Sequence, residues 1–230
     1  MNTQERLMMM LEQTANALGS DLIAKTAFVG GCVVGLLLTD EYTKQQVRAT
    51  DDVDLIVDVM NHAEYYELSE KLRQRGFKES PQDEIHCRWR LRELIVDVMP
   101  IDEKILGFTN RWYKLAIESA TPHTLPNGQI IRVVSPPYFV ATKIAAFHGR
   151  GNGDFLESRD IEDIITIVDG REELADEIRQ IGGELHHYIA QNFIDFLKKN
   201  DFDYAVESAV RCDNERATIV VDRFTLIAKG

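Results

Sequence analysis

Residues 48–57 read Arg-Ala-Thr-Asp-Asp-Val-Asp-Leu-Ile-Val, and they give the clearest indication of the fold class in this sequence. From Asp52 onward, acidic and apolar residues alternate with the period of two that is typical of a β-strand. Side chains two apart on a strand share a face, so Asp52 and Asp54 lie side by side, about 6–7 Å apart along the chain. Two such carboxylates repel each other, which predicts a cation or a proton between them.

A third acid interrupts the apolar run Leu94-Ile-Val-Asp97-Val-Met. Residues 86–91 are a second strand candidate, and about two residues separate the two runs, so a hairpin is expected. A buried carboxylate without a partner is costly, and three acids on adjacent strands offer the oxygen ligands that hard divalent ions prefer. Asp52, Asp54 and Asp97 therefore predict a site for two Mg²⁺ ions, with Mn²⁺ as the alternative metal.

The same residues also permit a simpler interpretation. Asp52 and Asp54 could end an edge strand in solvent, and Asp97 could form a buried ion pair with one of the arginines. We favour the metal site because a glycine pair, Gly30-Gly31, lies about 20 residues upstream and the third acid lies downstream.

Gly30-Gly31 separates a short apolar strand, residues 27–29, from the apolar stretch 32–38, which is compatible with a buried helix. Backbone amides without side chains at the start of a helix can approach a triphosphate closely. The alternative for the glycine pair is a tight turn without a ligand.

The remaining pattern predicts an α+β fold with a mixed-sheet core in residues 1–135 and a helical region in residues 136–230. A further strand is expected at 130–134, and residues 107–129 are expected to be mostly irregular. Helices are expected over residues 5–17, 61–75, 111–118, 136–148 and 158–168, and through most of 171–230.

Composition excludes several classes of protein. The chain has 230 residues, 44% hydrophobic and 28% charged, as expected of a globular domain. No run reaches the roughly 18 apolar residues that cross a bilayer, so no membrane partner is expected. The three cysteines form no CxxC or CxxH group, which favours the reducing cytoplasm over a disulfide framework.

The net charge of −12 is unevenly distributed: residues 154–230 carry 9 Lys/Arg against 18 Asp/Glu. A polyanion would be repelled by that part of the chain. The best candidate track for RNA is Arg88, Arg90 and Arg92, which alternate with apolar residues and would share one face of a strand. The alternative is that this row pairs with the helix acids Glu67 and Glu70.

Three motifs together resemble a known family. They are Phe28-Val-Gly-Gly, Arg48-x-Thr50-x-Asp52-Val-Asp54-Leu, and Lys143 followed by Ser158-Arg-Asp160-x-x-Asp163. Their order, over residues 25–170, resembles the DNA polymerase β-like nucleotidyltransferases, and within them the AbiEii-type enzymes of abortive-infection and toxin–antitoxin systems. Many members have a serine after the first glycine of the turn, where this chain has Gly31 and then Cys32.

The resemblance implies transfer of NMP from an NTP to a hydroxyl acceptor, with RNA as a candidate acceptor and a cognate antitoxin as a candidate partner. Asp52, Asp54 and Asp97 would hold the metal ions, and Asp97 would accept the proton of the attacking hydroxyl. The nucleotide would be bound by six residues: Gly30, Gly31, Arg48, Thr50, Lys143 and Asp160.

Other interpretations stay open at this point. The acceptor could be a protein or a small molecule, or the fold could serve as a nucleotide-binding or interaction module without turnover. Lys143 and Arg150 share a helix face on which they could reach phosphates, or could lie in solvent. Asp160 could orient Lys143, or could complement the helix dipole while Arg159 pairs with Asp163.

Overall fold

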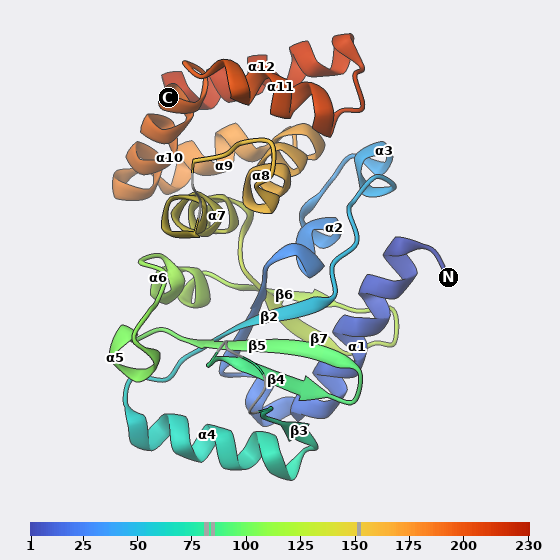
Figure 1. Cartoon of the computed structure of the whole chain (residues 1–230), viewed down its shortest axis with the longest axis vertical. Helices are drawn as coiled ribbons and strands as arrows, with labels where there is room; N and C mark the ends of the chain where they lie inside the picture. Colours follow the sequence, from blue (N-terminus) through green and yellow to red (C-terminus); the bar gives the residue numbers. More distant parts are fainter. Residues whose placement is uncertain (81–82, 84–85, 151–152) are drawn as a thin grey trace. The chain divides into compact units, whose positions relative to one another are not determined.

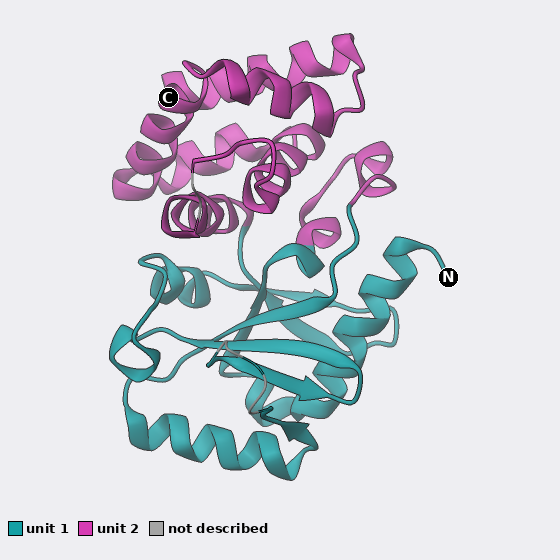
Figure 2. Ribbon diagram, viewed as in Figure 1, with its two compact units in different colours: residues 1–33, 48–135 teal, residues 34–47, 136–230 magenta. Residues whose placement is uncertain are grey.

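The structure is a computed structural model that describes residues 1–80, 83, 86–150 and 153–230. The chain forms two compact units (Figure 2), which we call the sheet unit and the helical unit. The sheet unit comprises Met1–Val33 and Arg48–Ser135, and the helical unit comprises Val34–Val47 and Pro136–Gly230. The predicted α+β class is confirmed: a mixed sheet with helices comes first, and a helical region follows it.

Seven strands form one sheet in the order β3-β4-β5-β2-β1-β7-β6 (Figure 1). Their bounds are β1 Thr26–Val29, β2 Asp52–Val57, β3 Phe77–Lys78, β4 Arg88–Leu91, β5 Leu94–Pro100, β6 Thr121–Thr124 and β7 Ile130–Val133. β2 runs parallel to β5 and antiparallel to β1. The acidic strand is therefore internal, and the expectation that Asp52 and Asp54 could end an edge strand is wrong.

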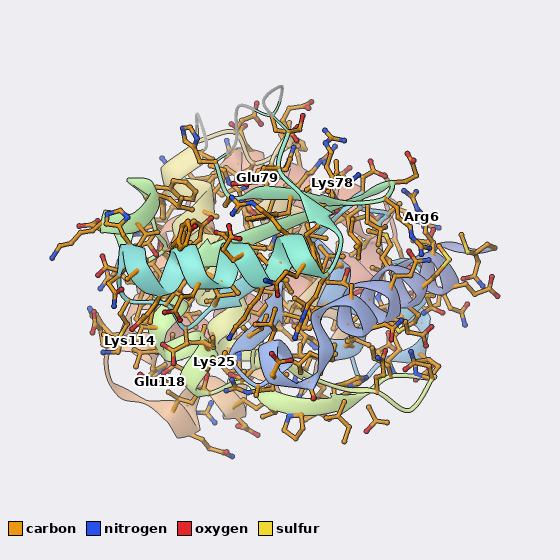
Figure 3. The ribbon with its side chains drawn as sticks, turned by 90° about the horizontal axis from the view of Figure 1, so that it is seen from below. Arg6, Lys25, Lys78, Glu79, Lys114 and Glu118 are labelled. Atoms are coloured by element: carbon orange, nitrogen blue, oxygen red, sulfur yellow. The ribbon has the colours of Figure 1, made fainter. Side chains whose placement is uncertain are left out.

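The sheet unit also contains the helices α1 Thr3–Ile23, α4 His62–Gln74, α5 Glu103–Leu106 and α6 Tyr113–Glu118, and the 3₁₀ turn η1 Gly31–Val33. Figure 3 views this unit from below, with α4 and α1 nearest the reader and strands behind them. The Asn61 side chain accepts a hydrogen bond from the Glu64 amide and so caps the start of α4, the helix that the sequence predicts for residues 61–75.

Strand register assigns the two faces of the sheet. Val53 pairs with Val96, which pairs with Trp89, so these apolar side chains share one face. α4 covers that face, because its Arg73 guanidinium lies 5.6 Å from the centre of the Trp89 ring. Asp52 and Asp54 belong to the opposite face.

The helical unit consists of α2 Val34–Leu37, α3 Glu41–Lys44, α7 Pro136–Arg150, α8 Arg159–Gly170, α9 Leu174–Ile181, α10 Gly183–Phe196, α11 Asn200–Ala209 and α12 Asn214–Lys229. An aromatic cluster, with ring centres 4.4–6.1 Å apart in its contacting pairs, forms part of the core: Phe147, Phe155, Phe193, Phe196, Phe202 and Phe224. Apolar residues at helical spacing thus bury one face of each long helix, as predicted for residues beyond 171.

The structure differs from the sequence expectations in three places. The apolar stretch 32–38 forms no single helix: η1 belongs to the sheet unit, and α2 belongs to the helical unit. Residues 107–129, expected to be mostly irregular, include β6, which pairs antiparallel with β7. The short elements α3, β3 and α5 were not predicted. Each has at most four residues, so it offers little periodicity to detect.

Candidate metal centre

The three predicted acids meet on one face of the sheet. Asp54 lies directly opposite Asp97 in the parallel β2–β5 pair, and Asp52 precedes Asp54 by two residues. One carboxylate oxygen from each acid lies within 4.8 Å of the others. Asp97 is buried, and the other two are half-buried. Three carboxylates at this spacing are a donor set that could hold divalent metal ions.

The glycine turn is shaped around one of these acids. Gly30 follows β1 with a φ of 78°, and a Cβ added to it would lie 1.8 Å from Asp54 Oδ2. Only glycine leaves room for the carboxylate beside this backbone. A glycine that leaves space for one carboxylate, next to two further carboxylates, is compatible with a metal site. The close approach of Asp54 therefore explains why residue 30 is a glycine.

The segment before β2 contacts both Asp52 and the glycine turn. Thr50 is buried, and its hydroxyl donates a short hydrogen bond to Asp52 Oδ1. A Cβ added to Gly31 would lie 2.9 Å from Arg48 Nη2, so the guanidinium occupies the space beside the second glycine. The structure thus brings Gly30 next to Asp54, Thr50 next to Asp52, and Arg48 next to Gly31, all within the sheet unit.

Asp97 has a cationic partner. Arg88 Nε donates to Asp97 Oδ1 at 2.9 Å, and Arg88 Nη2 donates to Asp97 Oδ2 at 2.8 Å. The ion pair that the simpler interpretation expected for Asp97 is therefore present, together with the acid cluster. Sequence reasoning did not single out Arg88 for this role. The predicted hairpin could have revealed this pair, because a turn that pairs Leu91 with Leu94 also aligns Arg88 with Asp97.

The arginine row is not an open cationic surface. Arg90 makes a second two-point contact, with Asp83, at 2.9 and 2.7 Å. The proposed partners Glu67 and Glu70 are not the ones used: Glu70 accepts instead from Arg73. Arg92 follows β4 at the hairpin turn, with a φ of 56°. Two of the three guanidiniums are thus already held by carboxylates.

Two buried cysteines lie beside elements of the site: Cys32 is in η1, and Cys87 directly precedes β4. The Cys32 thiol contacts the Val29 carbonyl at 3.4 Å and so belongs to the glycine turn. Burial, with smaller effects from the charges of Asp97 and Asp54, raises the pKa of the Cys87 thiol to about 12. Cys87 therefore stays a neutral thiol at physiological pH.

Lys143 and Asp160 lie in the helical unit, where they form a charged cluster between α7 and α8. Lys143 Nζ lies 3.1 Å from Asp160 Oδ1 and 2.6 Å from Asp163 Oδ2. The exposed Arg150 guanidinium contacts both oxygens of Asp160. Asp163 is only 1% exposed and pairs with Lys143, which differs from the alternative in which it pairs with Arg159.

A separate cavity of about 290 Å³ lies at the ends of β1 and β2 that are farther from the acids. Its lining includes Thr26, Val57, Asp58 and Lys25, and Figure 3 labels Lys25. Because Thr26 pairs with Val57, whereas Val29 pairs with Asp54, the cavity is three residues along the strands from the acids. It is therefore distinct from the acid cluster.

Neither the protein-family models nor the curated proteins contain a match to this chain. Within the described ranges, no helix has both the length and the apolar character needed to cross a membrane.

Proposed function

We propose that this chain is a metal-dependent nucleotidyltransferase of the DNA polymerase β-like type, which transfers NMP from an NTP to a hydroxyl group. One observation supports it above all: Asp54 lies opposite Asp97, with Asp52 on the same face, beside the glycine turn. A phosphate-transfer site needs carboxylates that hold metal ions and backbone amides of residues without a side chain, here Gly30 and Gly31.

Asp52, Asp54 and Asp97 would hold two Mg²⁺ ions. When bound, these ions supply positive charge to the attacking and leaving oxygens of the phosphoryl group. Thr50 fixes the orientation of Asp52 by its hydrogen bond, and Gly30 gives Asp54 its space. Arg48, whose guanidinium lies beside Gly31, would attract the triphosphate. A bond would form from the acceptor oxygen to the α-phosphorus as pyrophosphate leaves, and Asp97 would take the hydroxyl proton.

Lys143 is proposed as a further triphosphate contact, positioned by Asp160. The support is their contact within the helical unit and the motif resemblance. Because Lys143 already has two carboxylate partners, its charge is largely compensated in the absence of nucleotide.

The proposal includes two candidates for the acceptor of the NMP group. RNA follows from the resemblance to AbiEii-type toxins, with a cognate antitoxin as partner. A hydroxyl on a protein or small molecule is favoured by two observations. The Arg88 and Arg90 guanidiniums are engaged by aspartates, and residues 154–230 carry a net charge of −9.

The test is transfer of label from each α-³²P-NTP with Mg²⁺, offered total RNA, protein or no acceptor. Asp54→Asn should lower transfer about 100-fold or more, because an amide lacks the charge that a metal centre needs. Asp58→Asn, one residue beyond the far end of the same strand, is the matched control and should keep activity. Equal transfer by Asp54→Asn and wild type would reject the proposal. Growth of cells expressing wild type or Asp54→Asn tests the toxin role.

A further inference from the structure

We propose that Arg88 is the resident countercharge of the acid cluster and competes with divalent cations for Asp97, so that the cluster binds metal ions weakly until a triphosphate is present. This inference rests on the proposed metal site. It assigns Arg88 as a positioning residue that controls metal affinity, a role different from the RNA contact expected from the sequence.

The first support is geometric. Arg88 lies opposite Asp97 in the antiparallel β4–β5 pair, and Asp97 lies opposite Asp54 in the β5–β2 pair. One row across three strands therefore carries a guanidinium and two carboxylates on the same face. Both Asp97 oxygens accept from Arg88, so any cation at Asp97 must share an oxygen with the guanidinium or displace it.

The second support is charge. The cluster carries three carboxylates, and Arg88 sets one positive charge against them. A guanidinium does not lose its proton in proteins, so this charge remains when a cation arrives. The remaining charge opposes binding of a second cation at the same carboxylate.

The third support is burial. The Arg88 and Asp97 side chains are only 19% and 11% exposed, so solvent screens their interaction weakly. The Arg90–Asp83 pair has the same two-point geometry two residues farther along the strand, but Arg90 is 45% exposed. Arg90 thus provides a control with the same chemistry away from Asp97.

The consequence is a centre that senses nucleotide. Without NTP, Arg88 offsets part of the acid charge and disfavours free metal ions. A triphosphate brings negative oxygens that compensate for Arg88 and supply further metal ligands. Metal ions and nucleotide then bind together more tightly than either binds alone.

The experiment measures Mn²⁺ binding to the purified full chain by the EPR signal of free Mn²⁺, without nucleotide. Arg88→Gln should bind Mn²⁺ about tenfold more tightly than wild type, because one opposing charge is gone. Its melting temperature in EDTA should fall, and the rise on adding Mg²⁺ should exceed that of wild type. Arg90→Gln should match wild type in Mn²⁺ affinity. Equal or weaker Mn²⁺ binding by Arg88→Gln overturns the inference.

Two further variants keep the test decisive. If Arg88→Gln does not fold, Arg88→Lys replaces it; its single ammonium reaches the carboxylate less completely, so Mn²⁺ affinity should rise about threefold. Affinity no tighter than wild type overturns the inference. Adding Asp54→Asn to either variant should abolish Mn²⁺ binding. If Mn²⁺ binding instead survives Asp54→Asn, the ion lies elsewhere, and both the inference and the proposed metal site fail.

Discussion

Gly30 has no side chain, and this leaves the space that the Asp54 carboxylate occupies in the acid cluster. Its φ of 78° lies in the left-handed region, and its Cα faces the Asp54 carboxylate. The Gly-Gly pair alone is weak information in a sequence. The structure gives each glycine a neighbour that a Cβ would touch: Asp54 for Gly30 and Arg48 for Gly31.

We therefore predict that Gly30→Ala lowers the free energy of unfolding by about 1–3 kcal/mol, from backbone strain and from displacement of Asp54. Metal binding should weaken with it, since Asp54 must move. Urea unfolding and Mn²⁺ titration measure the two effects. Gly149→Ala, on an exposed helical position with no atom within 4 Å of the added Cβ, should cost nothing. Unaltered stability and metal affinity for Gly30→Ala would contradict this account.

At the scale of the element, α7 and α8 are joined by charge as well as by apolar packing. Lys143 projects from α7 toward Asp160 and Asp163 on α8, and all three are at most 8% exposed. Buried charges are tolerated only when paired, so each member of this cluster depends on the others. Asp160 also has Arg150, whereas the deeper Asp163 has Lys143 as its ion-pair partner.

Lys143→Met should therefore lower the free energy of unfolding by about 3 kcal/mol, because Asp163 would be left as a buried charge without its cation. Adding Asp163→Leu should recover most of the loss, which identifies charge rather than volume as the cause. Lys198→Met, which breaks the exposed i,i+3 pair with Asp195, should cost less than about 1 kcal/mol. Chemical denaturation of all four proteins measures these differences. Equal losses for the Lys143 and Lys198 variants would contradict it.

At the scale of the whole molecule, residues 34–47 leave the sheet unit after η1, belong to the helical unit, and return at Arg48. Arg216 of α12 holds them there. Its Nη2 lies 2.6 Å from Asp40 Oδ2, its Nε lies 2.7 Å from Asp169 Oδ1, and its guanidinium lies 4.7 Å from the Tyr42 ring. The C-terminal helix thus anchors the segment that connects the glycine turn to the acidic strand.

Arg216→Gln should speed amide hydrogen exchange in residues 39–46 about tenfold or more, since this anchor is lost. The hydrogen bond from Thr43, together with Arg216, lowers the pKa of Asp40 from 3.8. A lowered carboxyl pKa stabilises the fold above its ordinary value, and this contribution is lost as pH falls through the lower folded value. The difference in stability between variant and wild type should therefore persist just below pH 4 and shrink only as the pH falls further, toward the lowered folded pKa of Asp40.

Exchange mass spectrometry at pH 7 and urea unfolding at pH 7 and at a series of pH values from about 4 down to about 2 provide the measurements. Arg179→Gln, which breaks an exposed pair with Asp176 in the same unit, is the control and should leave exchange in residues 39–46 unaltered. Protection in that segment that does not change with Arg216→Gln would show that other contacts hold it.

Features that depend on local backbone geometry could be predicted from the order of the amino acids. The period of two places Asp52 and Asp54 on one face of a strand, and a two-residue turn pairs the strands that carry Arg88 and Asp97. Helix periodicity and the Asn61 cap depend on neighbours within a turn or two, so the long helices were predictable. The α+β class follows from these elements.

Contacts between segments far apart in the chain could not be predicted in this way and are known from the folded structure. Sheet order made β2 internal and set Asp54 beside Asp97, and helix packing buried Asp163 against Lys143. A sequence pattern fixes which way a side chain points from its own element. Which residue it meets depends on how distant elements pair and pack, and that is a property of the folded chain as a whole.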